Sequence, residues 1–346
     1  MNNKLKVGMI GIGAMGRGHL DQYLRLMAEG YPVELVAICD IDEKKFKGEF
    51  IPGNIDNVGV GKYNFDAYRL YTDIDAMLAA EQLDYVDIAL PTYLHAEVSI
   101  KAMERGLNVL CEKPMALTPE QCDAMIAAQQ RTGKTLMIAQ CLRFWPAYMT
   151  LKQYVDEGTF GKVVSAYFFR GGSTPQWSYE DWLIKEEKSG GCILDQHVHD
   201  VDTINWIFGA PEAVSTQAVN CIAGSGYDAV STHYRYPGQV FINAQDDWYM
   251  NGKMPFQMTF RVNFEGGTLV LAAGKLTIYP VGGEPFEPDI TQEDGYYNEV
   301  RYFIQCLRAG EQPCRATLQS TRQTICIATA ERASAAQRGE WVPVRV

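Results

Sequence analysis

The sequence predicts an α/β fold, in which a doubly wound domain is followed by an α+β domain with a large, mostly antiparallel open sheet. Up to about residue 142, short runs rich in Val, Ile and Leu alternate with helical patterns, as in parallel sheets covered on both faces. Beyond that point the chain is β-rich, and several runs alternate apolar with polar residues. A chain of 346 residues is also too long for one ordinary core. We therefore expect domains at 1–142 and 143–346, with the last helices able to pack back on the first domain.

The expected elements follow in order along the chain. In the first domain, strands are predicted at 6–12, 34–40, 85–90, 108–113 and 135–140, and helices at 18–30, 95–106 and 119–133. In the second domain, strands are predicted at 163–170, 213–222, 229–236, 239–248, 256–264, 267–273 and 275–280. A helix is expected from about residue 193, and two more close the chain at 299–310 and 318–339.

Composition excludes several classes of function. A net charge of −11 argues against binding to nucleic acid, because phosphate contacts need a basic surface. No apolar run approaches the roughly 20 residues that span a bilayer, and we expect no cleaved leader. The nine cysteines are scattered without a C-x-x-C pair, which disfavours metal fingers and a disulfide scaffold. Reduced thiols in a cytoplasmic protein are the simplest interpretation.

The first strand runs into a glycine-rich turn, Gly11-Ile12-Gly13-Ala14-Met15-Gly16, with a predicted helix after it. A G-x-G-x-x-G pattern in this setting is typical of a Rossmann dinucleotide site, where phosphates lie at the helix N-terminus. Asp40 ends the next strand, 24 residues after Gly16, and is placed to bind the adenosine ribose hydroxyls. A carboxylate there repels a 2′-phosphate, so we expect NAD rather than NADP, although Lys44 and Lys45 soften the repulsion.

Polar residues follow two further strands of this predicted sheet. Ligands bind at the carboxyl ends of strands in open parallel sheets, so position alone makes candidates of four residues. They are Thr92, His95, Glu112 and Lys113. From position alone, Lys113 is equally well explained as a solvated lysine at a strand end.

The order of motifs resembles the glucose–fructose oxidoreductase / inositol dehydrogenase (Gfo/Idh/MocA) family. The glycine turn is followed by "LPTYLHAE", "CEKP" and "SGGCILDQHVHDVD", and the likeness covers essentially the whole chain. The resemblance implies a Rossmann domain and a second domain whose open sheet forms a subunit interface, as in a homodimer or homotetramer. It also implies a nicotinamide cofactor that oxidises a sugar or cyclitol hydroxyl, or reduces the ketone.

The resemblance assigns roles to individual positions. The family lysine falls on Lys113, its aspartate on Asp195 and its histidine on His199. Pro91, Thr92 and His95 match a loop on the nicotinamide side, where many relatives have asparagine in place of Thr92. An arginine at Arg143 matches a family segment in which its role varies.

The segment at 190–206 concentrates titratable groups in an apolar surround. In a continuous α-helix, Asp195, His199 and Asp202 share one stripe, with His197 and Asp200 on roughly the opposite side. One metal ion cannot be bound by all five, and the histidines lack i, i+4 spacing, so we expect no metal site. The stripe suits acid–base chemistry, with His199 accepting a proton and Lys113 stabilising the developing alkoxide. Whether lysine or histidine is the final proton acceptor stays open.

Four weaker candidates complete the expected site. Arg143 and His197 are candidates for substrate contact, although His197 is equally well explained by a bond to a backbone carbonyl. Trp182 and Tyr296 are aromatic candidates, because such faces pack against sugar C–H groups, whereas core packing is the default for any one of them.

Three functions fit these features. The first is an NAD-dependent dehydrogenase or reductase acting on a sugar, a glycoside or a cyclitol. The second is a glycoside-cleaving enzyme that retains NAD and oxidises its substrate transiently before elimination. The third is a non-catalytic sensor of dinucleotide and sugar, and no DNA-binding motif or basic patch supports it.

Overall fold

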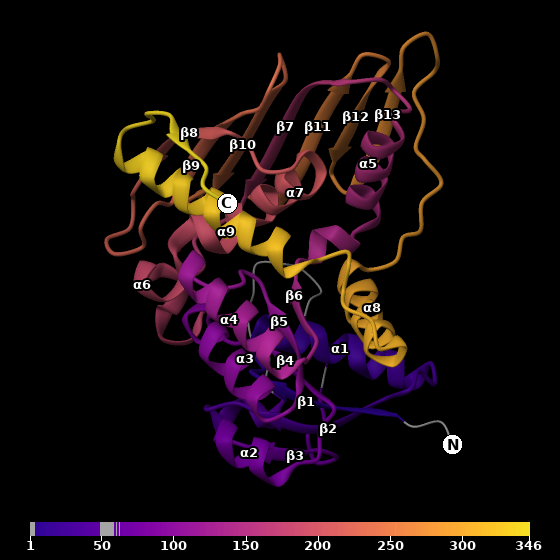
Figure 1. The fold of residues 1–346 in the computed structure, drawn as a ribbon, viewed down its shortest axis with the longest axis vertical. Coiled ribbons are helices and arrows are strands. Elements are labelled where there is room, and N and C mark those ends of the chain that lie inside the picture. The colour runs from indigo at the N-terminus through magenta and orange to yellow at the C-terminus, as the bar shows by residue number, and fades with distance from the viewer. Residues whose placement is uncertain (1–3, 49–58, 60, 62, 253) are drawn as a thin grey trace. The chain divides into compact units, whose positions relative to one another are not determined.

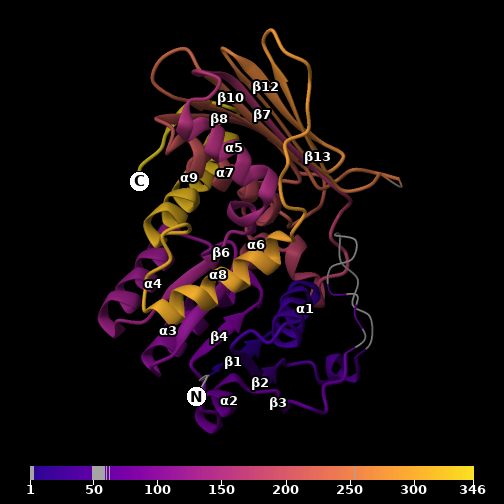
Figure 2. The same cartoon turned by 90° about the vertical axis from the view of Figure 1, so that its right-hand side faces the viewer.

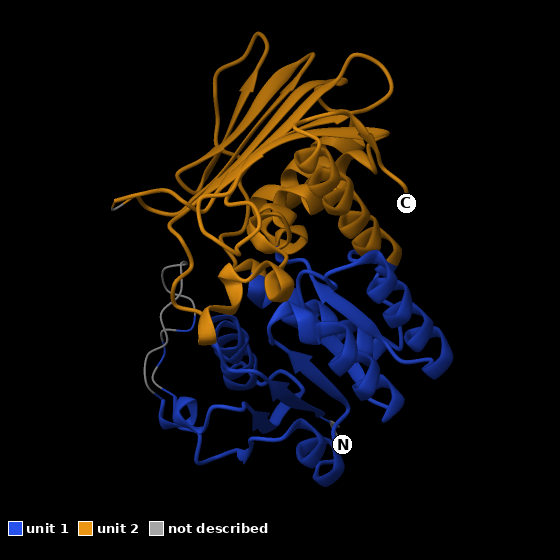
Figure 3. Cartoon of the chain, turned by 90° about the vertical axis from the view of Figure 1, so that its left-hand side faces the viewer, with its two compact units in different colours: residues 1–141, 296–318 blue, residues 142–295, 319–346 orange. Residues whose placement is uncertain are grey.

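The computed structural model describes residues 4–48, 59, 61, 63–252 and 254–346. It divides into two compact units, one formed by residues 1–141 and 296–318 and the other by residues 142–295 and 319–346 (Figure 3). We call them unit 1 and unit 2 and describe each by itself.

Unit 1 is a doubly wound α/β domain, as the alternation of elements predicted. Its sheet has the order β3-β2-β1-β4-β5-β6, and every neighbouring pair is parallel. The strands are β1 (Leu5–Ile10), β2 (Val33–Cys39), β3 (Arg69–Tyr71), β4 (Tyr85–Ile88), β5 (Asn108–Glu112) and β6 (Leu136–Ala139). The helices are α1 (Ala14–Ala28), η1 (Glu43–Lys47), α2 (Ile74–Ala80), η2 (Thr92–Leu94), α3 (His95–Glu104), α4 (Pro119–Thr132) and most of α8 (Gly295–Ala309).

The order of this sheet reverses between β1 and β4, which is the point where such folds bind ligands. The register pairs Ile10 with Ile88 and Ile88 with Cys111, so the three strands end side by side. The residues that follow these strands therefore share one edge of the sheet. Their central positions are almost wholly buried, which explains the continuous apolar runs in the sequence.

Unit 2 is built on an eight-stranded sheet of order β13-β12-β11-β7-β10-β9-β8-β14 (Figures 1 and 2). The strands are β7 (Val163–Gly171), β8 (Ala213–Val219), β9 (Ala229–Arg235), β10 (Phe241–Asp247), β11 (Gln257–Phe264), β12 (Gly267–Ala272), β13 (Lys275–Pro280) and β14 (Val342–Pro343). All neighbours are antiparallel except the parallel pair β7–β10, which confirms the mostly antiparallel open sheet that the sequence predicted.

Unit 2 also contains helical segments. They are η3 (Cys141–Phe144), α5 (Pro146–Glu157), η4 (Tyr179–Ile184), α6 (Glu186–Ser189), η5 (Ile193–His197), α7 (Val198–Phe208) and α9 (Leu318–Ala336). In both views α5, α7 and α9 lie on the same side of the strands (Figures 1 and 2). Inward-facing residues of β7, such as Ala166 and Phe168, are buried, whereas Tyr167 and Phe169 on the opposite face are half-buried.

Candidate active site

The glycine turn after β1 has the geometry that a dinucleotide site requires. Gly11 has φ +91°, and a Cβ there would lie 2.4 Å from the carbonyl oxygen of Ala89. A Cβ on Gly16 would lie 2.1 Å from the Gly11 carbonyl oxygen, so α1 packs directly on the turn. At Gly13, by contrast, a Cβ would meet nothing within 4 Å. Gly13 is also the N-cap of α1 and brings no side chain to its N-terminus, which leaves room for an anion there.

Asp40 lies directly beside this turn, although it is 28 residues away from Ile12 in the chain. One carboxylate oxygen accepts the Ile12 N–H at 2.9 Å, and the other accepts the Asp42 N–H at 3.0 Å. The ammonium group of Lys45 lies 2.8 Å from the same carboxylate. The structure thus brings together the glycine turn and the acid that sequence spacing linked to it, and it adds Lys45 as the acid's cationic partner.

The loop after β4 contains Pro91, Thr92 and His95. Thr92 and His95 are both buried, and the two ring nitrogens of His95 lie 2.8 Å from the carbonyl oxygens of Leu90 and Pro114. Burial lowers the pKa of His95, and the two carbonyl contacts oppose this effect. His95 therefore ties the loop after β4 to the segment after β5, and its contact with a cofactor stays a prediction.

Lys113 follows β5 at the same edge, is half-buried, and begins a cis peptide bond with Pro114. Its N–H donates to Oε2 of Glu112 at 2.9 Å. The other oxygen of Glu112 lies 3.0 Å from Nε2 of His19, in α1. Nδ1 of His19 in turn lies 2.9 Å from the Asp87 carboxylate of β4.

Sequence reasoning missed His19 and Asp87. A charged residue inside the otherwise apolar run at 85–90 was the one available signal, because such a residue needs a buried partner. Its partner lies 68 residues away and could not be identified without the fold.

The segment at 190–206 departs from a regular α-helix. Residues Ile193–His197 form a wider π-type turn, and the regular helix α7 follows it from Val198. Asp195 and His199 are half-buried, whereas Gln196, Val198 and Asp200 around them are buried. These two side chains therefore reach the surface of an otherwise enclosed segment.

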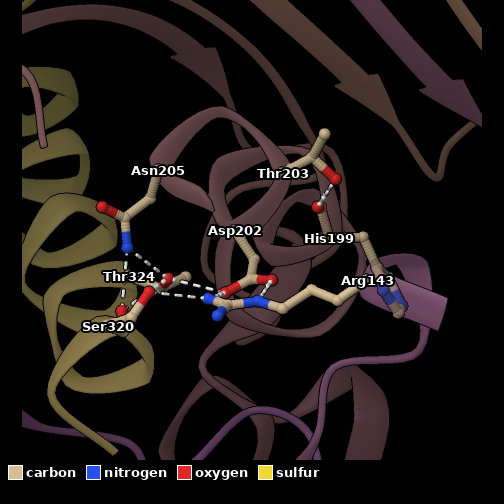
Figure 4. Close-up of polar contacts among 7 residues, drawn as sticks. All are labelled: Arg143, His199, Asp202, Thr203, Asn205, Ser320 and Thr324. Carbon is tan, nitrogen blue, oxygen red and sulfur yellow. Dashed lines mark hydrogen bonds and ion pairs between the residues drawn. The ribbon is translucent and has the colours of Figure 1, made fainter. Parts of the chain in front are cut away.

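Asp202 was expected on the same stripe, and the structure places it in the interior instead. Its carboxylate accepts hydrogen bonds from Nε and Nη2 of Arg143, at 2.8 and 2.7 Å, and from the hydroxyl of Thr324 at 2.8 Å (Figure 4). Ser320 of α9 accepts a further bond from Arg143 at 3.0 Å. His199 and Asp202 both lie in α7, three residues and therefore about 60° apart, and Asp202 is on the side of that helix that contacts Arg143 and Thr324. The Arg143 side chain is only 1% exposed, so the structure assigns it to this ion pair.

His197 is also fully buried. Its Nε2 lies 3.5 Å from Oε2 of Glu331 and 3.4 Å from the hydroxyl of Tyr234. Burial alone would lower the pKa of His197, but the Glu331 carboxylate outweighs it and the pKa is raised. The side chain thus contacts a carboxylate, whereas a substrate or a backbone carbonyl was expected.

The aromatic candidates fall in different places. Tyr296 is buried in unit 1, with its ring centroid 6.4 Å from that of His19. Trp182 is half-buried in unit 2 and follows Glu180 and Asp181, whose φ values are +52° and +55°. Their contact with a substrate stays a prediction. Among the described residues, no group of three or more His, Cys, Asp or Glu is arranged to hold a metal ion.

Lys113 belongs to unit 1, whereas Asp195 and His199 belong to unit 2. Their convergence on one substrate oxygen stays a prediction. Within the described chain, no helix is both long enough and apolar enough to cross a membrane.

Several known proteins are similar in sequence to this chain. Over 213 residues the chain is 30% identical to a 2,7-anhydro-N-acetylneuraminate hydratase from Mediterraneibacter gnavus, covering 61% of this chain and 53% of that protein. Over 337 residues it is 25% identical to a scyllo-inositol 2-dehydrogenase (NAD(+)) from Bacillus subtilis, covering 93% and 91%. The chain spans about half the length of the first of these relatives.

Among solved structures, a levoglucosan dehydrogenase in complex with NADH and levoglucosan superimposes with a TM-score of 0.82. Its sequence identity is 21%, with 99% of this chain and 100% of that chain covered, so this likeness shows the fold. Residues 5–140 match the model of an oxidoreductase family with an NAD-binding Rossmann fold, and residues 148–270 match the Gfo/Idh/MocA C-terminal domain. The chain therefore belongs to the Gfo/Idh/MocA oxidoreductase family, and unit 1 contains its NAD-binding Rossmann domain.

Proposed function

We propose that the protein is a nicotinamide-dependent dehydrogenase or reductase that interconverts a hydroxyl and a ketone on a sugar, a glycoside or a cyclitol. The observation that carries the proposal is the edge of the unit 1 sheet, where the glycine turn, Asp40 and Lys113 follow β1, β2 and β5 of one parallel sheet. Family membership and the names of two relatives, a scyllo-inositol dehydrogenase and a levoglucosan dehydrogenase, support the class of substrate.

The residues of unit 1 fit a dinucleotide. The open space at Gly13 and the N-terminus of α1 would hold the pyrophosphate, with Ala14 and Met15 in the first turn of that helix. Asp40 would bind the ribose hydroxyls, which favours NAD over NADP because a carboxylate repels a 2′-phosphate. Pro91, Thr92, His95, Glu112 and Lys113 would form the nicotinamide side. Bound NAD supplies the hydride acceptor, at C4 of its nicotinamide ring.

In the proposed mechanism, His199 accepts the proton of the reacting hydroxyl. Asp195, one turn earlier and also half-buried, binds a neighbouring hydroxyl of the same substrate. The Lys113 ammonium stabilises the negative charge that develops on the oxygen as its proton leaves. In the reverse direction the same groups return the proton to the ketone oxygen.

A second candidate is cleavage or hydration of a glycoside-like substrate with NAD retained between turnovers. The relative named as a hydratase of an anhydro sugar favours keeping this candidate. The two functions differ in one measurable respect, because only the first accumulates reduced cofactor.

Two further features belong to the proposal. Tyr167, Phe169 and the exposed Phe241 share the face of the unit 2 sheet opposite the buried Ala166 and Phe168, because the register pairs Phe241 with Ser165; such a face suits an interface between copies of the chain. We propose a homodimer or homotetramer formed through this face, in the cytoplasm.

The test is a screen of monosaccharides, glycosides and inositols with NAD and with NADP, following absorbance of the reduced cofactor and product formation. We expect turnover with NAD for at least one compound. Lys113→Met and His199→Asn should each lower kcat by about 10²–10⁴-fold, the typical contribution of a positioned acid or base. Lys101→Met is the control, because Lys101 of α3 forms a solvent-accessible ion pair with Asp75 of α2 and has no proposed role in turnover. Unchanged turnover in both active-site variants would contradict the mechanism.

A further inference from the structure

Three buried titratable side chains of unit 1 form a chain of contacts that ends at the main chain of Lys113. His19 stands between two carboxylates, with Nδ1 at 2.9 and 3.0 Å from the two oxygens of Asp87 and Nε2 at 3.0 Å from Oε1 of Glu112. His19 and Asp87 are wholly inaccessible, and the Glu112 side chain is 7% exposed. We call His19, Asp87 and Glu112 the buried triad.

The contacts of the triad fix the protonation state of His19. A neutral imidazole carries one N–H, so its other nitrogen would direct a lone pair at a carboxylate oxygen. Both contacts are favourable only for the imidazolium. Burial alone would lower the pKa of His19, but Asp87 and Glu112 outweigh it, and the pKa is raised well above its usual value. The raised pKa and the two flanking carboxylates both favour the imidazolium form of His19.

Stability does not explain such a triad. Taking charges out of water costs several kcal/mol for each ion, and apolar replacements of buried ion pairs are often neutral or stabilising. The position of the triad is more informative. Asp87 lies in β4 and Glu112 ends β5, the strand that leads into Lys113.

Glu112 links the triad to Lys113. One oxygen of Glu112 faces His19, and the other accepts the N–H of Lys113 at 2.9 Å. Burial raises the pKa of Glu112, but His19 and then the Lys113 ammonium outweigh this, and the pKa is lowered. The carboxylate is thus held on one side by a fixed cation and on the other by the main chain of the lysine.

We propose that His19 is a positioning residue for Lys113, acting through Glu112. The imidazolium holds the Glu112 carboxylate against the Lys113 N–H and neutralises part of its charge, so the Lys113 ammonium points toward the substrate oxygen. Without the imidazolium, the Glu112 carboxylate draws the ammonium to itself or takes up a proton. This inference rests on the role proposed above for Lys113.

The first experiment compares single and double variants with the substrate on which the wild-type protein turns over. His19→Gln removes the cation, and we expect kcat to fall about tenfold to hundredfold, because small displacements of a reacting group have effects of this size. KM and the Kd of NADH should change less than about threefold. In the Glu112→Gln background, adding His19→Gln should lower kcat by less than about threefold more. A purely structural role for His19 would instead give effects that multiply.

Tyr23→Phe is the matched control. Tyr23 lies one turn after His19 in α1, is fully buried, and donates to the same Asp87 carboxylate at 2.8 Å. It makes a comparable buried hydrogen bond without contacting Glu112 in the described structure. We expect its kcat to stay within about twofold of the wild type. An equal loss in Tyr23→Phe and His19→Gln would overturn the proposal.

A second measurement needs no variant of the triad to fold. The chain has five histidines, so ¹⁵N labelling of histidine gives few imidazole signals. In a His197→Gln variant, which removes the other buried imidazole with a raised pKa, one imidazole should still keep both nitrogens protonated from pH 6 to pH 9, and its absence would overturn the proposal. If the wild type shows no turnover, the proposed function fails. If the wild type is active, Lys113→Met is inactive and His19→Gln keeps full kcat, only the role of His19 fails.

Discussion

Replacing Arg143 with methionine tests whether this arginine is a structural residue of unit 2, as its burial indicates. The substitution keeps most of the side-chain length and removes the charge. It leaves the Asp202 carboxylate buried, with the Thr324 hydroxyl still donating to it at 2.8 Å. Both bonds from Arg143, at 2.8 and 2.7 Å, are lost at a site where each side chain is 1% exposed.

The expected magnitude follows from that geometry. Removing one partner of a buried ion pair costs about 3–5 kcal/mol, because the other charge is left uncompensated. A unit of this size loses about 2–4 °C in melting temperature per kcal/mol, so we expect a drop of about 6–20 °C. Replacing both partners, Arg143→Met with Asp202→Leu, should recover most of the loss, since no buried charge remains.

Tryptophan fluorescence during urea or thermal unfolding measures this change. All six tryptophans, at positions 145, 177, 182, 206, 248 and 341, belong to unit 2, so the signal reports that unit alone. Lys152→Met is the control, because it breaks an exposed ion pair with Asp156 worth at most about 1 kcal/mol. A loss below about 1 kcal/mol in Arg143→Met, or a double variant no more stable than the single one, would refute the reasoning.

Three further predictions concern the two units separately. Gly16→Ala should destabilise unit 1, because its Cβ would lie 2.1 Å from the Gly11 carbonyl oxygen. Gly13→Ala should fold normally and weaken NADH binding, because its Cβ would meet nothing within 4 Å in the protein. Calorimetry measures unfolding and NADH binding for both variants, and equal effects of the two substitutions on stability would contradict this prediction. Asp40→Ser should lower the NAD over NADP ratio of kcat/KM at least about tenfold, and an unchanged ratio would count against the ribose contact. Burial raises the pKa of Asp246 to about 7, so the folded state holds a proton that the unfolded state releases near pH 4. Unit 2 should therefore lose stability as pH rises from about 4 to 7, and Asp246→Asn should flatten that slope in fluorescence-monitored unfolding.

The sequence by itself determined the class of fold and the edge of the unit 1 sheet that carries the glycine turn and Asp40, because the signals for both are local. Apolar runs without alternation marked the parallel strands, and alternation marked the open sheet. The glycine turn could be identified because Gly11 needs a positive φ and Gly16 needs close packing, and few other residues permit either. The short elements β3 and α2 carried too little pattern to be predicted. Helix α5 was also missed, although Pro146 starts it and Gly158 ends it.

Only the tertiary structure decided which charged groups meet. His19, Asp87 and Glu112 come from three separate elements, and Arg143 pairs with Asp202, which lies 59 residues further along the chain. Burial separated the half-buried Asp195 and His199 from Asp202, which the α-helical phase had placed with them. His199 and Asp202 lie three residues apart in α7, and only the packing of Arg143 and α9 against that helix decides which of the two is buried. Local sequence fixes backbone preferences, whereas the partner of a buried charge is chosen by the packing of distant elements.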